Sequence, residues 1–191
     1  MNYYNINAVE FVKETVSIDM SELYDRFLPL LPAACNILDA GCGTGRDTKA
    51  FLERGYKVTA FDQSQAMVEA AQKLTNQNVS CLAFQDIDYV DTFDGIWACA
   101  SLLHIPRHTL PAVFRKLRKA LRDHGVIYAS FKYGDFEGDR NGRFYHDLTE
   151  SSLMEICRCL WDIYQYCRGS LLLLPGKLDF ELCMDVHSRW I

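Results

Sequence analysis

Short apolar runs alternate with amphipathic segments between residues 36 and 131. The runs have strand length and are rich in branched and aromatic residues, at residues 36–41, 56–62, 79–84, 93–101 and 126–131. The segments between them repeat apolar positions at helical spacing, at residues 44–54, after Ser64, and at residues 109–121. Strands that alternate with helices in this way predict a parallel sheet.

The segments on either side of this alternation have different patterns. Apolar residues recur at helical spacing twice before residue 33, which predicts two helices. Residues 132–149 form a long polar stretch rich in Gly and Asp, which predicts a loop that is functional or disordered. A helix over residues 151–160 is expected next, followed by strands around residues 163–167 and 180–186.

The composition is that of an ordinary globular protein and leaves room for one domain. Of the 191 residues, 49% are hydrophobic and 24% are charged, which is enough for one core and little more. The formal net charge of −5 argues against a partner that is bound mainly through phosphate charge. DNA is therefore not expected as a partner, and RNA is disfavoured.

The cysteines and the apolar stretches narrow the class further. The chain has eight cysteines, mostly in apolar runs, and none forms a CxxC pair. They are expected to be reduced core thiols, and no metal site is expected because paired ligand spacing is missing. The start of the chain does not resemble a signal peptide, and the stretch SLLLLPG is too short to span a bilayer. A cytoplasmic protein without a membrane partner is predicted.

A glycine-rich segment, DAGCGTGRD, follows the first predicted strand and opens a helix. Its GxGxG spacing differs from the GxGxxG of dinucleotide-binding proteins. Open α/β sheets bind ligands at the carboxyl ends of their strands, where helix N-termini also supply free N–H groups. Asp62 ends the second predicted strand and can accept both hydroxyls of a ribose, while Asp86, after the third, can read the edge of an adenine. Asp94, at the start of the fourth, is the third acidic residue of the pattern.

The glycine segment and the three acidic residues together resemble the class I S-adenosylmethionine-dependent methyltransferase family, over residues 36–131. The stretches GCGTGRDTKAFLERGYKVTAFDQS, ASLLHIP and SFKYGDFEGDRNGRFY are similar to small bacterial methyltransferases related to tellurite resistance. The resemblance implies a Rossmann-like α/β fold: a doubly wound, seven-stranded, mostly parallel sheet with helices on both faces and an antiparallel last strand. It also implies a single methyltransferase domain over residues 1–191, with residues 1–33 as an N-terminal helical lid and residues 34–191 as the α/β core.

The same resemblance implies a site for S-adenosylmethionine, whose product is S-adenosylhomocysteine. In this family the glycine loop approaches the methionine part of the cofactor, and the acids after the second and third strands hold the ribose and the adenine. Asp62 and Asp86 match those two acids. The positions that carry over as cofactor-binding are Asp39, Gly41, Cys42, Gly43, Thr44, Gly45, Arg46, Asp62, Gln63, Met67, Gln85, Asp86, Ile87, Ala100, Ser101 and Leu102.

The acceptor side of the expected site follows the fourth and fifth strands. His104 is a candidate catalytic base, because an unperturbed imidazole titrates near neutral pH, and equally a candidate structural histidine. The candidates for substrate binding are Tyr3, Lys132, Tyr133 and Arg143. Because Lys and Arg bind anions, and Arg can bind a carboxylate bidentately, an anionic small molecule is the expected acceptor.

The predicted function is methyl transfer from S-adenosylmethionine to a small molecule. A base is needed only if the acceptor carries a proton that must leave. One alternative is an RNA-modifying methyltransferase, for which a basic surface is available at Arg115, Lys116, Arg118, Lys119 and Arg122. A second alternative is a non-catalytic partner protein that binds the cofactor. The chain is expected to be a monomer or a homodimer.

Overall fold

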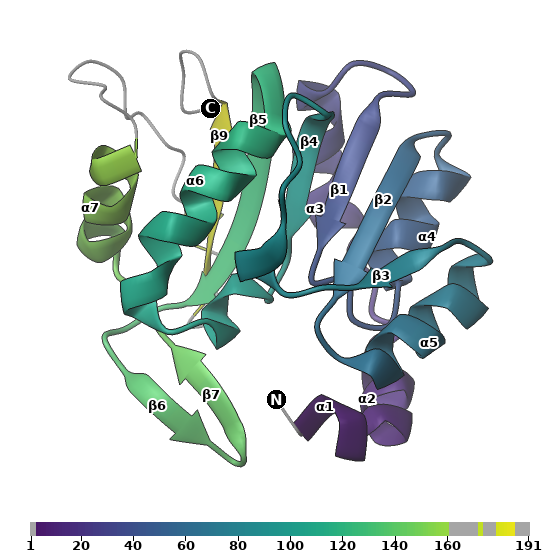
Figure 1. Ribbon diagram of the computed structural model, residues 1–191, viewed down its shortest axis with the longest axis horizontal. Coiled ribbons are helices and arrows are strands. Elements are labelled where there is room, and N and C mark those ends of the chain that lie inside the picture. Colours follow the sequence, from purple (N-terminus) through teal and green to yellow (C-terminus); the bar gives the residue numbers. More distant parts are fainter. Residues whose placement is uncertain (1–2, 161–171, 174–178, 186–191) are drawn as a thin grey trace.

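The computed structural model describes residues 3–160, 172–173 and 179–185. Its centre is a sheet in which five parallel strands lie side by side in the order β3-β2-β1-β4-β5, with helices on both faces (Figure 1). The prediction of a mostly parallel, Rossmann-like sheet is therefore confirmed. Among the described residues, no helix combines the length and the apolar character that crossing a bilayer would require.

The elements that build the sheet and its cover follow the predicted alternation. The parallel strands are β1 (Asn36–Ala40), β2 (Lys57–Asp62), β3 (Val79–Cys81), β4 (Phe93–Ala98) and β5 (Leu121–Lys132). The helices are α1 (Tyr3–Ile6), α2 (Ala8–Thr15), α3 (Ser21–Phe27), α4 (Arg46–Glu53), α5 (Gln65–Thr75), α6 (Leu110–Ala120) and α7 (Glu150–Leu160).

The core consists of two layers, one on each face of the sheet. Ile37 and Trp97 point to the face that α3 and α4 cover, where they join one buried cluster. Leu38 and Ile96, the neighbours of these residues in β1 and β4, join a second buried cluster with α6 and α7. Side chains of a strand alternate between the two faces, so a strand that is covered on both sides reads as a continuous apolar run. This is why the sequence predicts β1 and β4 well.

The far edge of the sheet is antiparallel. Strand β9 (Asp179–Asp185) pairs antiparallel with β5, and β8 (Leu172–Leu173) pairs antiparallel with β9. The strand predicted around residues 163–167 lies outside the described residues. The predicted count of seven strands therefore stays a prediction. Strand β5 also begins earlier than predicted, because Leu121 pairs with Phe93 ahead of a shift in register.

Residues 132–149 do not form the loop that the sequence predicts. They contain a two-stranded hairpin of β6 (Glu137–Arg140) and β7 (Arg143–His146). Asn141 and Gly142 make the turn, with φ values of 56° and 79°. An Asn-Gly pair with two positive φ values is the preferred two-residue hairpin turn, because its twist matches the twist of the strands. The signal is present in the sequence, but the mostly polar strands around it hide the usual apolar alternation.

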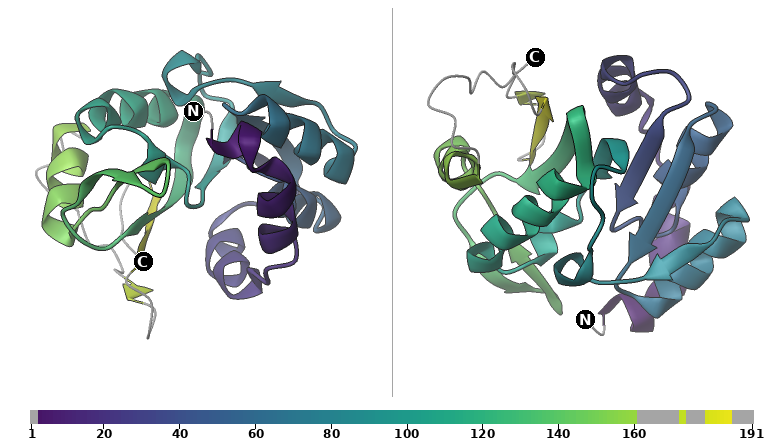
Figure 2. Two further views of the ribbon diagram at one scale, coloured as in Figure 1. Left: turned by 90° about the horizontal axis from the view of Figure 1, so that it is seen from below. Right: turned by 45° about the horizontal axis from the view of Figure 1, so that its top comes forward.

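The hairpin and the N-terminal helices gather at one edge of the sheet. In Figure 1 the strands β1 and β2 end at the lower edge, where α1 and the β6–β7 hairpin also lie. The view from below in Figure 2 shows α1 across the middle of this edge. Segments from the start, the middle and the later part of the chain therefore meet at the carboxyl ends of the parallel strands.

Candidate functional site

A cavity of about 640 Å³ opens at this carboxyl edge, a size typical of small-molecule sites. It brings together most of the predicted cofactor-binding and substrate-binding residues. The predicted residues that line it are Tyr3, Gly41, Cys42, Gly43, Thr44, Arg46, Asp62, Gln63, Met67, Ala100, Ser101, His104, Lys132 and Arg143. The predicted residues outside its lining are Asp39, Gly45, Gln85, Asp86, Ile87, Leu102 and Tyr133.

The glycine loop needs glycine for two separate reasons. The φ values of Gly41, Gly43 and Gly45 are 76°, 53° and 81°, which L-residues with a side chain rarely adopt. A Cβ atom on Gly41 would lie 2.5 Å from the Cβ atom of Ser101, so the loop packs directly against the segment after β4. A Cβ atom on Gly43 would meet only the Phe11 ring, at 3.9 Å. The backbone at Gly43 is therefore open to a ligand in the cavity.

Asp62 joins the glycine loop to the start of α5. Its Oδ2 accepts the N–H of Gly43 at 2.9 Å, and its Oδ1 accepts the N–H of Ser64 at 2.8 Å. Burial raises the pKa of Asp62, and the hydrogen bonds from the backbone oppose this shift. A carboxylate oxygen has two lone pairs, so both oxygens keep capacity for a hydroxyl of a ligand. The predicted role of Asp62 as a ribose ligand stays a prediction.

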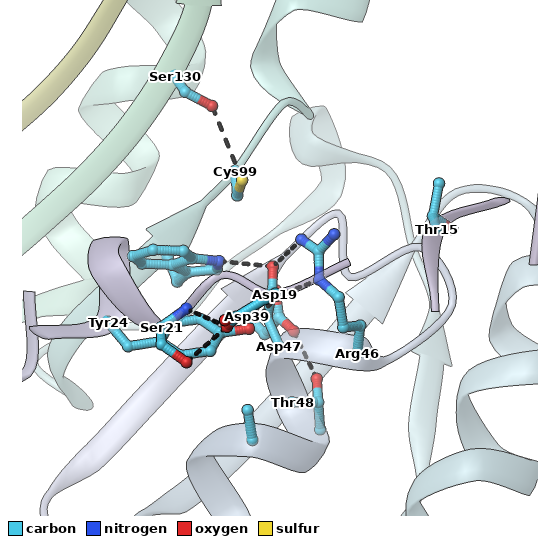
Figure 3. A network of polar contacts seen from close by, with 12 residues as sticks. Thr15, Asp19, Ser21, Tyr24, Asp39, Arg46, Asp47, Thr48, Cys99 and Ser130 are labelled. Atoms are coloured by element: carbon cyan, nitrogen blue, oxygen red, sulfur yellow. Dashed lines mark hydrogen bonds and ion pairs between the residues drawn. The ribbon is translucent and has the colours of Figure 1, made fainter. Parts of the chain in front are cut away.

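Arg46 is oriented by a buried network at the start of α4 (Figure 3). The carboxylate of Asp47 accepts hydrogen bonds from the Tyr24 hydroxyl at 2.5 Å and from the Trp97 indole at 2.8 Å. It also accepts from Arg46, whose Nε and Nη2 lie 2.6 and 3.0 Å from its two oxygens. Arg46 therefore presents a held guanidinium at the cavity. Sequence reasoning missed Asp47, whose only signal was its place next to Arg46.

Asp39 lies beneath the glycine loop and is only 2% exposed. Its Oδ2 accepts a hydrogen bond from the Thr48 hydroxyl at 2.5 Å, which ties β1 to the first turns of α4. Burial, with the nearby charge of Asp47, raises the pKa of Asp39 to about 8. Its contacts are those of a residue that positions the loop, and the predicted contact with the cofactor stays a prediction.

The residues predicted to hold adenine lie around a short 3-10 helix, η2 (Phe84–Asp86). Phe84 lines the cavity and packs edge-to-face on Phe61. Gln85 and Asp86 are exposed beside the cavity, and Ile87 is buried in the core. Sequence reasoning did not single out Phe84, which contributes an apolar side chain to the cavity lining. The adenine-binding roles of Gln85, Asp86 and Ile87 stay predictions.

The segment after β4 forms the floor of the cavity. Ala100 has a φ of 48°, an uncommon value for a residue with a side chain. Its N–H donates to the Ser130 hydroxyl at 2.7 Å, and the Ser101 hydroxyl donates to the Ala40 carbonyl at 2.7 Å. These bonds hold the floor to β5 and β1. Leu102, also predicted here, is fully buried below the floor.

His104 connects α1 to the hairpin. Its Nδ1 lies 2.7 Å from the Phe144 carbonyl oxygen, and its Nε2 lies 2.7 Å from the Tyr4 hydroxyl oxygen. A carbonyl can only accept, so Nδ1–H donates to it, and Nε2 accepts from the Tyr4 hydroxyl. Burial lowers the pKa of His104 to about 4 and raises the pKa of Tyr4 to about 12. Both groups are therefore neutral near pH 7, and the lone pair of the imidazole is already engaged.

Arg143 stands among aromatic rings at the acceptor end. The centre of its guanidinium lies 4.5 Å from the centroid of the Tyr3 ring, 5.5 Å from that of Tyr145 and 5.8 Å from that of Tyr4. The Lys132 ammonium lies 5.9 Å from the Tyr145 ring. Tyr133, the fourth predicted substrate residue, is 40% exposed outside the cavity, because it follows the end of β5.

Asp94 lies away from the cavity, whereas Cys42 is part of its lining. Asp94 is at the opposite edge, where it accepts from the N–H of Asn36 at 2.9 Å and from Arg122 at 2.8 Å. Its inclusion with Asp62 and Asp86 was wrong, because it starts a strand, and parallel strands start at the edge opposite their ends.

Burial raises the pKa of the Cys42 thiol, as expected for a small core residue. Among residues 3–160 and the two late strands, no group of three or more His, Cys, Asp or Glu residues could hold a metal ion.

Comparisons with known proteins agree with this geometry. Residues 37–125 match the family described as the methyltransferase domain. The chain is 30% identical over 127 residues to the malonyl (acyl-carrier protein) O-methyltransferase of Erwinia pyrifoliae, an alignment that covers 64% of this chain and 41% of that protein. It is also 30% identical over 127 residues to the magnesium-protoporphyrin O-methyltransferase of Rhodobacter capsulatus, with 62% and 56% covered. The chain thus spans about half the length of these curated relatives.

Solved structures share the fold over almost the whole chain. One is the 1,6-didemethyltoxoflavin-N1-methyltransferase of Burkholderia thailandensis, solved with 1,6-didemethyltoxoflavin and S-adenosylhomocysteine. It superposes with a TM-score of 0.70 at 23% identity, covering 96% of this chain and 83% of that one. The chain is therefore similar in sequence to methyltransferases over residues 37–125, and it shares the fold of a solved methyltransferase.

Proposed function

We propose that the chain transfers a methyl group from S-adenosylmethionine to a small molecule. The convergence of Gly43 and Asp62 on one cavity, within the stretch that matches a methyltransferase domain, carries this proposal. The family match and the neighbour solved with S-adenosylhomocysteine support S-adenosylmethionine as the cofactor.

The residues at the cavity fit this cofactor. Asp62 keeps lone pairs for the ribose hydroxyls, and Gly43 leaves its backbone open for a close approach. Arg46, held by Asp47, presents a guanidinium that suits the carboxylate of the methionine part. When bound, S-adenosylmethionine supplies a methyl group on a positively charged sulfur.

The role of the protein in this reaction is to align the acceptor and to exclude water. Tyr3 and Tyr4 of α1 line the cavity opposite the glycine loop, so α1 would act as the lid over both ligands. Alignment of two reactants in a closed site can remove roughly 7–11 kcal/mol of an activation barrier. This contribution needs no catalytic side chain that takes part in bond making.

The finer parts of the proposal concern the acceptor and the setting of the protein. Lys132 and Arg143 support an anionic acceptor, because both cationic side chains line the cavity. The kinship with methyltransferases related to tellurite resistance, the cytoplasmic location and a monomeric or homodimeric state remain part of what we propose.

The test is calorimetric titration of S-adenosylhomocysteine into the wild-type chain, Asp62→Ala and Asp62→Asn. We expect saturable binding to the wild type and a loss of affinity of at least about tenfold in both variants, because a charged hydrogen-bond acceptor is lost. Asp88→Ala is the matched control, since Asp88 is an exposed acid outside the cavity lining. Absence of binding to the wild type would refute the proposal.

A further inference from the structure

The guanidinium of Arg143 has no carboxylate partner in the part of the chain that the structure describes. The side chains that act on it are Tyr3, Tyr4 and Tyr145. The Arg143 guanidinium and the Tyr4 hydroxyl also interact electrostatically. Its Nε is buried and, within residues 3–160, has no hydrogen-bond partner. The ring faces offset part of the cost of this burial, but a buried donor without an acceptor is destabilising.

The neighbouring Arg140 shows what Arg143 lacks. Nη1 and Nη2 of Arg140 donate to the two oxygens of Asp147, at 2.8 and 2.6 Å. This is the bidentate pairing that a planar guanidinium offers to a carboxylate. Arg140 and Arg143 sit opposite each other in the hairpin, with paired positions on β6 and β7. Arg140 is satisfied from within the chain, whereas Arg143 faces the cavity with a donor unused.

Among the described residues, the side chains in contact with Arg143 and His104 offer no free base that could remove a proton from an acceptor. The imidazole Nε2 of His104 already accepts from Tyr4, and its Nδ1–H is committed to the Phe144 carbonyl. The other titratable or charged groups around His104 are Lys132 of β5 and Arg143, Tyr145 and His146 of β7. Lys132 and Arg143 are cations, burial raises the pKa of Tyr145, and burial lowers the pKa of His146. An acceptor that arrives protonated would find no base among these groups.

We propose that the acceptor binds as an already ionised acid, a carboxylate or a similar planar oxyanion, with its charge held by Arg143. This inference rests on the proposed function and narrows its substrate class. An oxygen lone pair of the anion forms the new bond to the methyl carbon, the electron pair of the carbon–sulfur bond stays on sulfur, and no proton is transferred. Negative and positive charge cancel in this step.

Because charge cancels in this step, Arg143 is assigned to binding of the acceptor. The acceptor oxygen carries more negative charge before the reaction than in the transition state. The guanidinium therefore stabilises the ground state at least as well as it stabilises the transition state. Arg143→Gln is therefore expected to raise KM for an acid acceptor by at least about tenfold and to leave kcat unchanged or higher. If Arg143 were a base or a purely structural residue, its substitution would instead lower kcat.

The experiment is calorimetric titration of the S-adenosylhomocysteine complex with benzoate and with benzamide, its neutral analogue of equal shape. We expect benzoate to bind at least about tenfold more tightly than benzamide to the wild type. The preference should vanish in Arg143→Gln and shrink in Arg143→Lys, which keeps the charge and loses the planar fork. Arg115→Gln removes the same charge from an exposed position outside the cavity lining and should keep the preference.

The result that would overturn the inference is equally concrete. Equal affinity for benzoate and benzamide, no binding of either, or a preference that survives in Arg143→Gln would each reject Arg143 as the anion site. Melting temperature and affinity for S-adenosylhomocysteine are measured on every variant, so a misfolded variant is recognised. A chain that binds S-adenosylhomocysteine through Asp62 but does not prefer benzoate would keep the proposed function and lose this inference.

Discussion

Asp39 is a buried carboxyl group whose protonation depends on the fold. Its carboxyl group lies under the glycine loop, 2% exposed, with the Thr48 hydroxyl as hydrogen-bond donor and Asp47 as a charged neighbour. Burial raises its pKa to about 8, whereas an aspartate in an unfolded chain has a pKa of about 3.9. Between these two values the folded chain holds a proton that the unfolded chain has released.

Stability should therefore fall as the pH rises through this window, because the unfolded state binds fewer protons than the folded state there. Asp39→Asn removes the titration and keeps an acceptor for the Thr48 hydroxyl. We expect the stability of this variant relative to the wild type to increase by roughly 2–5 kcal/mol between pH 5 and pH 9. Urea denaturation at several pH values measures it, with exposed Asp88→Asn as control. Parallel stability curves for Asp39→Asn and the wild type would contradict the shifted pKa.

At the scale of elements, α1 is a single short turn that touches three separate parts of the cavity. Tyr3 lies against Arg143 of the hairpin, and Tyr4 donates to His104 after β4. Asn5 reaches the start of α5, where its Oδ1 accepts from the Ser64 hydroxyl at 2.7 Å and from the N–H of Ala66 at 3.2 Å. Consecutive residues thus connect the cofactor end of the cavity to the acceptor end.

We expect Asn5→Ala to speed the release of S-adenosylhomocysteine by roughly three- to tenfold, because a bond between α1 and α5 worth about 1 kcal/mol is lost. The melting temperature should change little, since Asn5 is exposed and outside the core. Stopped-flow displacement measures the dissociation rate, and Ile6→Ala, another exposed residue of α1, is the control. If both variants release the ligand at the wild-type rate, α1 does not limit its exit.

At the scale of the whole molecule, most of the sheet can be predicted from the sequence. Most contacts between residues that are far apart in the sequence cannot be predicted. Strands covered on both faces need apolar side chains at most positions, which is why β1 and β4 can be predicted from the sequence. The hairpin is polar, so only its Asn-Gly turn marks it. The bond between Tyr4 and His104 joins residues 100 positions apart, and no local pattern encodes it. Asp62 could be singled out from the sequence because its place at the end of a strand is local information. The role of Asp47 depends on its contacts with Tyr24 and Trp97, which are far from it in the sequence.

The charge of the whole molecule bears on the RNA alternative. The net charge is −5, and part of the basic run around α6 has contacts within the chain. Lys116 donates to the Ile87 carbonyl at 2.9 Å, and Arg122 pairs with Asp94 at 2.8 Å. We therefore expect labelled tRNA to show no change in fluorescence anisotropy at 150 mM salt with up to about 10 μM protein. Tight binding that weakens steeply with added salt would reopen that alternative.

The hairpin also has a consequence for how such a protein can change. Arg143, the proposed anion site, belongs to the hairpin that is closed by the Asn141-Gly142 turn. The glycine loop and Asp62 lie in a different stretch, before residue 65. A substitution or exchange within the hairpin can therefore alter acceptor preference while the donor half is inherited unchanged. The proposed anion site at Arg143 and the predicted cofactor site are therefore encoded by separate segments of the gene.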